Sequence, residues 1–347
     1  MLAGRSLTFW HNAARPHALG QSLTPYLLGA VLALSTILSQ GTLPVAISLL
    51  LAAAGFVGVA YAHLGLNLFD DYFDYRGGAV ARREELQEGG MRSRMGKCAY
   101  LKTGVTLDDT RKVAILFLVI AGALGALIFA IRGWEVLIFA GCALVLGIAY
   151  AGPPLRLSYH GLGELVVGVI LGPLVVISAY FVVCGRVDPL AVFVSIPTGL
   201  LAMNILNAHA TMDFESDKAA HRTTFAVFAG SQKAGAVSSV ALVVLSYGAV
   251  LAGVLLGFLP VLTLAVLLTL PMAVGFSRLI LRYAQDNAAP FVYRRWMGPM
   301  EHWDRIVERG TDWFMIRWYL SRNLLMAFVL ILAVTGLTPW HLPALLG

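Results

Sequence analysis

Two short acidic runs contain the residues of this sequence that are best suited to chemistry. The first run holds Asn67, Asp70, Asp71 and Asp74, and the second holds Asp213 and Asp217 with His209 four residues before it. Each run follows a long apolar stretch. Ionised carboxylates beside a bilayer are costly and rarely persist there without a cation or a partner. Two such runs therefore indicate a shared charged ligand.

The spacing within each run gathers its polar groups on one side of a helix. Residues three or four apart share a helix face, which applies to the whole first run and to His209, Asp213 and Asp217. Mg²⁺ prefers oxygen ligands of this kind and commonly bridges to substrate phosphates. We therefore predict a Mg²⁺ site made by Asn67, Asp70, Asp71, Asp74, Asp213 and Asp217. Among these we expect Asp71, Asp74, Asp213 and Asp217 to act in catalysis.

Basic side chains lie close to both runs in the sequence. They are Arg94, Lys97, Lys102, Arg156, Lys218 and Arg222. Such groups can bind phosphate oxygens directly, and with His209 and Asn67 we predict that they bind substrate. A diphosphate at the mouth of an apolar bundle, with its hydrocarbon tail among the helices, accounts for both the charged and the apolar residues. Metal and bases would stabilise the departing diphosphate as an allylic carbon–oxygen bond ionises.

A plainer interpretation exists for each feature alone. A single acidic helix end is more often a solvated cap, and basic residues are usual in cytoplasmic loops. A cation-coupled transporter also places acidic residues in a membrane, although near the bilayer midplane. Two runs of matching spacing at helix ends favour phosphate binding over both alternatives.

The composition requires a membrane protein to position these residues. Of 347 residues, 59% are hydrophobic and only 13% are charged, which excludes an ordinary soluble domain. Windows of roughly 20 apolar residues predict an all-α polytopic bundle that forms one domain over 1–347. The nine predicted spans are 22–40, 45–66, 112–131, 134–150, 163–184, 190–206, 235–256, 260–282 and 323–345.

The distribution of basic residues predicts how the chain crosses the cell membrane. With nine spans, 23 of the 25 Lys and Arg residues fall on one side, which is expected to be the cytoplasmic side. The N-terminus and both acidic runs would then face the cytoplasm. The net charge of +6 indicates contact with anionic lipid, and no soluble basic domain is present to favour nucleic acid.

Three further segments lie outside the predicted spans. The first 20 residues lack the apolar core of a cleavable signal peptide, so we expect the chain to keep them. The cytoplasmic loops are predicted at 75–112 and 283–322. The second loop mixes four Trp with several Arg, which is typical of an interfacial helix in the headgroup plane; a lid over the site is the alternative.

Together these residues resemble the UbiA superfamily of intramembrane prenyltransferases. That family has nine helices, two cytoplasmic Asp-rich motifs and basic loops between them. The stretch from Asn67 to Asp74 is similar to its N-x-x-x-D-x-x-D motif, and Asp213 to Asp217 is similar to its D-x-x-x-D motif. The resemblance covers about residues 15 to 282 and the last span. It implies a polyprenyl diphosphate donor, Mg²⁺ and an aromatic acceptor.

The segment from Tyr150 to Glu164 carries a finer resemblance. Its pattern, Y-x-G-x-P followed by Y-x-G-L-G-E, resembles the branch that prenylates 1,4-dihydroxy-2-naphthoate in menaquinone synthesis. The resemblance implies that Tyr150 borders the reacting allylic carbon. From their sequence positions alone, Tyr150 and Tyr159 are better explained as anchors at the membrane interface than as catalytic residues.

The chain departs from that branch near the second motif. Where the branch has N-N-x-R-D, this sequence has Asn207-Ala-His209-Ala-Thr-Met-Asp213, which lacks the Arg. The usual G-K-x-T-L is replaced by His221-Arg222-Thr223-Thr224, and the loop at 283–322 is longer. The departures leave open another acceptor, either a non-aromatic lipid or a different phenol, with the same donor.

Overall fold

The computed structural model of the chain describes residues 4–40, 44–91 and 98–337, and in them the chain is helical almost throughout. The helices are α1 (Leu7–Ala13), η1 (Pro16–Ala18), α2 (Gly20–Gln40), α3 (Val45–Arg76), α4 (Ala79–Glu88), η2 (Ala99–Thr103), α5 (Leu107–Arg132), α6 (Glu135–Ala151), η3 (Leu157–Tyr159), α7 (Gly163–Val169), η4 (Ile170–Leu174), α8 (Val175–Cys184), α9 (Pro189–Met212), α10 (Phe214–Ala219), α11 (Phe225–Phe228), α12 (Gln232–Leu255), η5 (Val261–Thr269), α13 (Leu270–Gln285), η6 (Arg295–Met297), α14 (Trp303–Glu308) and α15 (Asp312–Thr335).

The predicted all-α membrane bundle is confirmed. Eight helical segments in the described ranges are long and apolar enough to cross a membrane, and α6 is a shorter apolar helix. Three of the segments combine helices of different types within one span. Two of them join η1 to α2 and η5 to α13. The third joins α7 to α8 through the π-helical turn η4, which contains Pro173. Pro lacks the N–H that an α-helix interior needs, so a local change of helix type at Pro173 is expected.

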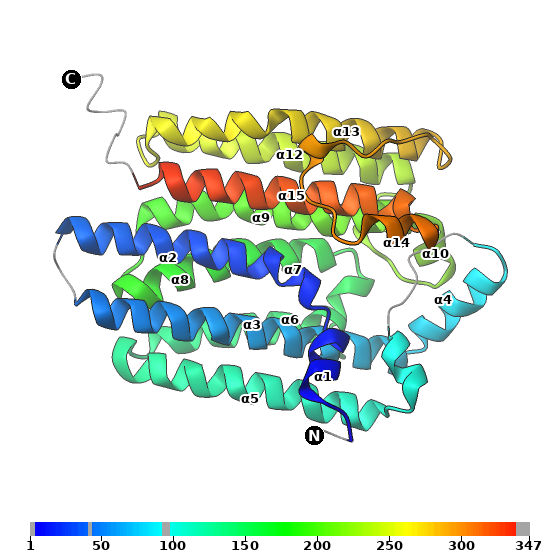
Figure 1. The fold of residues 1–347 in the computed structure, drawn as a ribbon, viewed down its shortest axis with the longest axis horizontal. Coiled ribbons are helices and arrows are strands. Elements are labelled where there is room, and N and C mark those ends of the chain that lie inside the picture. Colours follow the sequence, from blue (N-terminus) through cyan, green and yellow to red (C-terminus); the bar gives the residue numbers. More distant parts are fainter. Residues whose placement is uncertain (1–3, 41–43, 92–97, 338–347) are drawn as a thin grey trace.

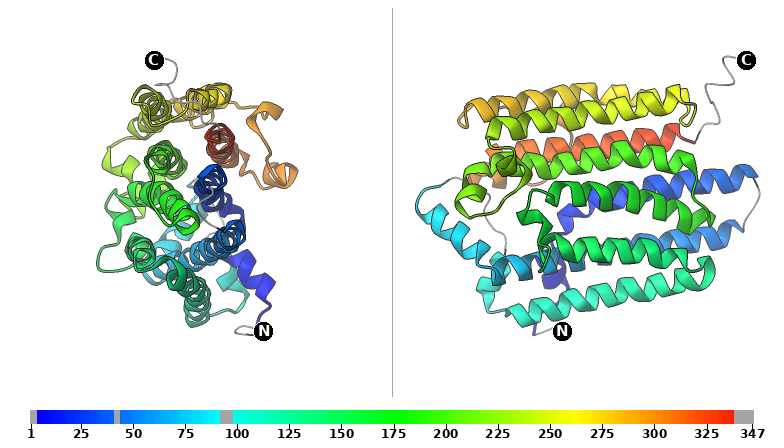
Figure 2. Two further views of the ribbon diagram at one scale, coloured as in Figure 1. Left: turned by 90° about the vertical axis from the view of Figure 1, so that its left-hand side faces the viewer. Right: turned by 180° about the vertical axis from the view of Figure 1, so that it is seen from behind.

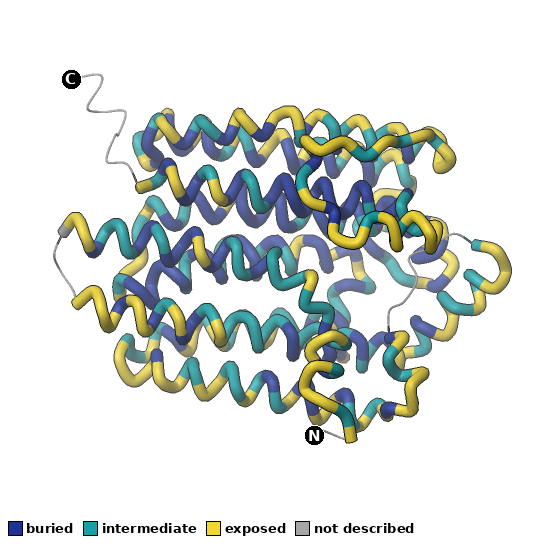
Figure 3. Tube along the Cα trace, in the orientation of Figure 1, coloured by how far each residue is buried: buried dark blue, intermediate teal, exposed yellow. Residues whose placement is uncertain are grey.

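The long helices lie side by side, up and down, with the short helices gathered mainly at one end (Figures 1 and 2). The largest helix interfaces are those of α3 with α5, α9 with α12 and α2 with α8. Helix α15 packs against α2, α9 and α13 and is the most buried candidate span, whereas α5 is the least buried (Figure 3). Helix α15 therefore forms the centre of the bundle and α5 one of its flanks.

Two boundaries differ from the sequence prediction. Helix α3 runs to Arg76, beyond the predicted span 45–66 and into the predicted loop 75–112, so the whole first acidic run lies on one continuous helix, as its spacing predicted. Helix α15 begins at Asp312 and ends at Thr335, in place of the predicted span 323–345. Hydropathy windows excluded its first three turns because they contain Arg317 and Arg322, which the fold buries.

This shift also corrects the predicted late loop. The connection between α13 and α15 is 286–311, which we call the connector. Trp313 and Trp318 lie within α15 and are each only 4% exposed, so they are core residues and not interfacial anchors. Trp296 and Trp303 remain in the connector, which contains only the short helices η6 and α14. The prediction of one interfacial helix that carries all four Trp residues is therefore wrong.

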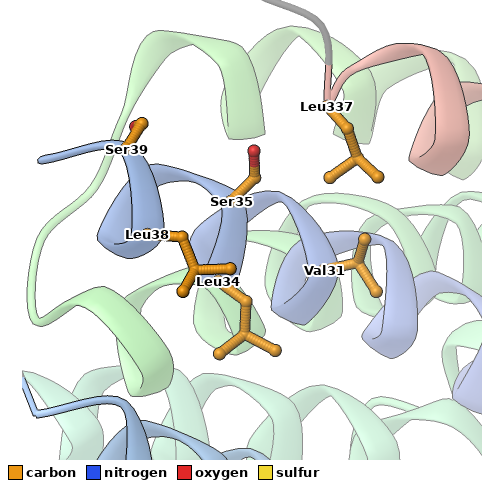
Figure 4. Close-up of a pocket in the computed structure, with 6 residues that line it drawn as sticks. All are labelled: Val31, Leu34, Ser35, Leu38, Ser39 and Leu337. Carbon is orange, nitrogen blue, oxygen red and sulfur yellow. The ribbon is translucent and has the colours of Figure 1, made fainter.

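The two ends of the bundle differ in character. Helix α3 ends near α4 and α10, at the end where the polar residues of interest lie (Figure 1). At the opposite end, where α2 finishes, an open pocket is lined by Val31, Leu34, Ser35, Leu38, Ser39 and Leu337 (Figure 4). Its mostly aliphatic lining and two hydroxyls offer no charged group. The two acidic runs therefore lie at the end of the bundle opposite to this pocket.

Candidate active site

The first acidic run occupies the last three turns of α3. Asp71 and Asp74 are 1% and 2% exposed, although both are ionisable. Because residues on one helix face pack against the same neighbours, these carboxylates point into the protein rather than into solvent. Burying an unpaired charge is strongly unfavourable, so each carboxylate needs a cationic partner.

Arg15 supplies the partner for the start of this run. Its Nη2 atom lies 3.2 Å from Asp70 Oδ2 and 3.2 Å from Asp71 Oδ1. The same group donates a hydrogen bond of 2.9 Å to the carbonyl of Asn67. Asn67 in turn donates its side-chain amide to the carbonyl of Ala14 at 2.9 Å. The N-terminal arm is thus fastened across the first acidic run.

The second acidic run lies across a break between two helices. Helix α9 ends at Met212, α10 begins at Phe214, and Asp213 lies between them. The one-turn spacing is kept, because Asp213 N donates to His209 O at 2.9 Å and Asp217 N donates to Asp213 O at 2.8 Å. Asp213 and Asp217 are 5% and 3% exposed. The predicted spacing is present, although the helix is not continuous.

Arg83 of α4 supplies the partner for Asp217. Its guanidinium forms an ion pair and hydrogen bond with Asp217 Oδ1. Burial raises the pKa of the Asp217 carboxyl to about 6, against the lowering effect of the charges of Arg83 and Arg222. Since α4 directly follows α3, this pair connects the end of α3 with α10.

Arg222 makes a second connection between the two runs. Its backbone N–H donates to Asp217 O at 2.8 Å, and its Nη1 atom lies 3.5 Å from Asp74 Oδ2. Burial lowers the pKa of the Arg222 guanidinium, but the charges of Asp74 and Asp217 raise it more, so the net change is upward. The two acidic runs therefore face each other across one arginine side chain.

Tyr159 completes the environment of Asp74. Its hydroxyl donates to Asp74 Oδ1 at 2.7 Å. The guanidinium groups of Arg156 and Arg222 lie 4.0 Å and 5.4 Å from the centre of its ring, within the range of a cation–π contact. Tyr159 thus orients one carboxylate and holds two cations next to it.

Other residues of the Y-x-G-L-G-E motif bind the backbone of the loop that follows Arg222. Gly161 N donates to Thr223 O at 2.6 Å, and the backbone has a positive φ of 75° at this glycine. Glu164 Oε1 accepts from Phe225 N at 3.1 Å. Each polar member of Y-x-G-L-G-E therefore either contacts Asp74 or fastens the chain directly after Arg222.

Three other predicted site residues, Tyr150, His209 and Lys218, lie in different surroundings. Tyr150 lies in the last turn of α6, and its ring is close to Gly163. His209 lies one turn before Asp213, beside the rings of Phe314 and Trp318 at 5.1 and 6.1 Å. Lys218 is exposed on α10.

Two of the predicted basic residues, Lys102 and Lys218, form no ion pair with the acidic runs in the described ranges. Lys102 pairs with Glu84 at 2.9 Å, with both side chains largely in solvent, and Lys218 lies 5.9 Å from the ring of Phe214. Arg94 and Lys97 are outside the described residues.

Sequence reasoning did not select Arg15, Arg83 or Tyr159 as site residues. Tyr159 had a usable signal, since it belongs to the Y-x-G-L-G-E pattern. Arg15 and Arg83 had none beyond their charge, because only the fold brings the N-terminal arm and α4 onto the acidic runs.

The donor chemistry of the site fits Mg²⁺. Four buried Asp carboxylates from two opposed chain segments, with the amide of Asn67, are hard oxygen ligands. In this structure Arg15, Arg83 and Arg222 pair with Asp71, Asp217 and Asp74 respectively. No group of three or more His, Cys, Asp or Glu is gathered as a metal site within 4–40, 44–91 and 98–337. A bound cation would take over part of the charge balance that these arginines provide.

Comparison with known proteins places this geometry in context. The model of the UbiA prenyltransferase family matches residues 22–298. A 1,4-dihydroxy-2-naphthoate octaprenyltransferase of Bacillus subtilis is 29% identical over 65% of this chain and 67% of its own length. A 2-carboxy-1,4-naphthoquinone phytyltransferase of Synechocystis is 33% identical over 52% of this chain and 60% of its own length. The matched stretch thus spans about two thirds or less of these two relatives.

Solved structures resemble the fold over nearly the whole chain. A UbiA homolog from Archaeoglobus fulgidus, bound to GPP and Mg²⁺, has a TM-score of 0.60 at 13% identity and covers 94% of this chain and 99% of its own. A digeranylgeranylglyceryl phosphate synthase has a TM-score of 0.57 at 13% identity, covering 95% and 98%. At such identities the likeness concerns the fold alone.

Proposed function

This chain belongs to the UbiA prenyltransferase family, and from that premise we propose that it transfers a polyprenyl group from its diphosphate to 1,4-dihydroxy-2-naphthoate or a related quinone precursor. The family match covers most of the chain, and the relatives named above act on naphthalene-type acceptors. The proposal concerns the acceptor and the metal requirement as well as the reaction.

One observation carries the proposal. Arg222 donates its backbone N–H to Asp217 O and pairs through its guanidinium with Asp74, so one cationic residue links the two acidic runs. A diphosphate needs both cationic donors and metal-binding oxygens around it. The linked runs and their arginines supply both at a single end of an apolar helix bundle.

Asn67, Asp70, Asp71, Asp74, Asp213 and Asp217 are the residues that would hold Mg²⁺. When bound, Mg²⁺ supplies positive charge that stabilises the leaving diphosphate. Arg222 and Arg156 flank Tyr159 and are placed to donate to diphosphate oxygens. Tyr159 keeps Asp74 oriented through its hydroxyl, so that the carboxylate is ready for its ligand without rearrangement.

The reaction proceeds by bond exchange at the allylic carbon. The carbon–oxygen bond breaks and its electron pair leaves with the diphosphate. The electron-rich ring then forms a carbon–carbon bond to the allylic carbon, and with a hydroxynaphthoate acceptor the ring carboxylate departs as CO₂, which restores the aromatic ring. Burial of the acidic runs keeps water away from the cationic prenyl group, which water would otherwise capture.

A direct assay tests this proposal. Purified protein in detergent is incubated with a radiolabelled polyprenyl diphosphate, Mg²⁺ and 1,4-dihydroxy-2-naphthoate, and the products are identified by mass. We expect a prenylated naphthalene product and CO₂ in equal amounts, both abolished by EDTA and restored by Mg²⁺. Prenylation of a glycerol phosphate instead would contradict the proposed acceptor, and intact diphosphate with every acceptor would contradict prenyl transfer itself.

A further inference from the structure

The peptide unit that leads into Asp213 is held at both ends. Carbonyls in the last turn of an α-helix lack N–H partners within the helix. At the end of α9, Met212 O accepts a hydrogen bond of 3.1 Å from the hydroxyl of Tyr283, on α13. The N–H of Asp213, which belongs to the same planar peptide unit, donates to His209 O at 2.9 Å. Together the two bonds fix the orientation of this plane.

The neighbouring carbonyl is held in the same way. Thr211 O accepts from the side-chain amide of Gln232, at the start of α12, at 3.0 Å. The break between α9 and α10 is therefore set by two side chains from other helices. Of the two, Tyr283 acts on the peptide unit that contains the nitrogen of Asp213.

Tyr283 is itself held rigidly. It is 2% exposed, and its ring stacks on Trp313 of α15 with centres 5.7 Å apart and planes 14° apart. The guanidinium of Arg317, a residue only 1% exposed, lies 4.5 Å from the centre of the same ring. Arg317 also donates to the carbonyls of Leu279, one turn before Tyr283, and of Trp313. These contacts join α13 to α15 at the level of Tyr283.

The connector covers this cluster from outside the bundle. Phe291 lies 5.5 Å from the guanidinium of Arg317. Further along, Arg322 pairs with Glu301 at 3.1 Å, and Asn323 donates to the carbonyls of Met297 and Pro299 at 2.9 Å. The segment that follows α13 is thus fastened to α15 on the side of Arg317, which holds the ring of Tyr283.

We propose that Tyr283 is a positioning residue for the second acidic run. Its hydroxyl fixes the Met212–Asp213 peptide plane and thereby the direction in which the Asp213 carboxylate points toward the first run. Tyr283 has no contact with the diphosphate in this account and acts only through the backbone. The inference rests on the proposed function, since it gives Asp213 a ligand to hold.

The test removes the hydroxyl and keeps the ring. Tyr283→Phe is compared with Tyr26→Phe, because the Tyr26 hydroxyl also donates to a backbone carbonyl, that of Ala52 at 3.0 Å, and Tyr26 is equally buried. Ala52 precedes Asp71 by 19 residues on α3, about 28 Å along the helix. Calorimetry measures binding of the S-thiolodiphosphate analogue of geranyl diphosphate at fixed Mg²⁺, and thermal unfolding is recorded in parallel.

We expect Tyr283→Phe to weaken analogue binding about 3- to 10-fold, the range expected for one lost hydrogen bond, and Tyr26→Phe to change it less than about 2-fold. Both variants should lose similar thermal stability. In an Asp213→Asn background, Tyr283→Phe should weaken binding no further, because Tyr283 acts through Asp213.

Equal analogue affinities for the two Tyr variants would overturn the positioning role, as would an undiminished effect of Tyr283→Phe in the Asp213→Asn background. A wild-type protein that fails to bind the analogue with Mg²⁺ would instead overturn the proposed function beneath the inference. The wild-type measurement therefore separates the two failures.

Discussion

The two acidic runs serve one site but are built differently. The first lies on an unbroken helix, α3, and its carboxylates take their partners from Arg15, before α2, and Arg222, after α10. The second lies across the break between α9 and α10, and side chains of α12 and α13 hold the carbonyls before it. The first run is thus ordered by helix geometry, and the second by tertiary hydrogen bonds.

This difference predicts which kinds of substitution should disturb each acidic run. Within α3 the acids lie on one continuous helix, whose last turn is followed by a hydrogen bond from Gly77 N to Phe73 O, so substitutions there should act mainly through charge. At the helix break, backbone carbonyls depend on single distant donors, so substitutions that carry no charge should also disturb the acids. The predictions below test this contrast, from the largest expected effect to the smallest.

The largest effect should come from removing one carboxylate charge from either run. Asp71→Asn and Asp213→Asn keep the side-chain size, and we expect each to lower the rate of product formation at least about 100-fold, because each removes a charged ligand of the proposed Mg²⁺, whose positive charge would stabilise the leaving diphosphate. The rate is measured with saturating donor and acceptor. Asp108→Asn is the control, because Asp108 is half-exposed at the start of α5 and pairs with Arg111 and Lys112. A wild-type rate in either site variant would show that the acidic run containing that residue is not required for catalysis.

Arg222→Gln should reduce stability more than any other single change near the first run. It removes the ion pair between Arg222 and the buried Asp74, and breaking such a pair costs about 3 kcal/mol or more; the Arg222 side chain is only 13% exposed. Thermal and denaturant unfolding in detergent measure the loss. Arg156→Gln, which removes the other cation beside Tyr159, should cost about 1 kcal/mol or less. Equal losses would show that the ring contact, and not the pairing with Asp74, matters.

Tyr159→Phe should affect the first run through the orientation of Asp74. The lost bond joins a hydroxyl to a carboxylate, and such bonds contribute about 1.5–3 kcal/mol, so analogue binding with Mg²⁺ should weaken about 10-fold or more. Calorimetry measures the dissociation constant. If this variant binds as the wild type does, Asp74 is oriented by α3 alone, which would make the contrast between the runs sharper than we propose.

Gln232→Ala should have the smallest effect and only at the second run. It removes the donor to Thr211 O, one peptide farther from Asp213 than the bond of Tyr283, and we expect analogue binding to weaken about 3-fold. Ser246→Ala is the control on the same helix, since its hydroxyl bonds only to Leu242 O within α12. Binding unchanged by Gln232→Ala, or weakened equally by Ser246→Ala, would mean that the helix break is stable without its donor.

The same contrast explains what could be predicted from the sequence. The bundle of apolar helices follows from composition, because helices satisfy their own backbone groups in lipid. The common face of Asn67, Asp71 and Asp74 follows from helix periodicity, and α3 keeps that periodicity to Arg76. These features depend on local sequence, so the prediction succeeded there.

Features that depend on distant residues could not be predicted. The break at Asp213 is set by Gln232 and Tyr283, which are 21 and 71 residues from the carbonyls they bind. The partners Arg15 and Arg83 reach the acids only through the packing of the N-terminal arm and α4. The start of α15 was misplaced because ring faces and backbone carbonyls accommodate Arg317 inside the bundle, which no hydropathy window represents.

The central claim is that both acidic runs hold one metal-bound diphosphate together. The most direct test is a double-mutant cycle with Asp71→Asn and Asp213→Asn, in which calorimetry measures binding of the geranyl thiolodiphosphate analogue at saturating Mg²⁺. Groups that act as a unit are strongly non-additive, so the double variant should bind about as weakly as the weaker single variant. Losses that multiply in the double variant would mean that the two runs bind independently, and would contradict the account.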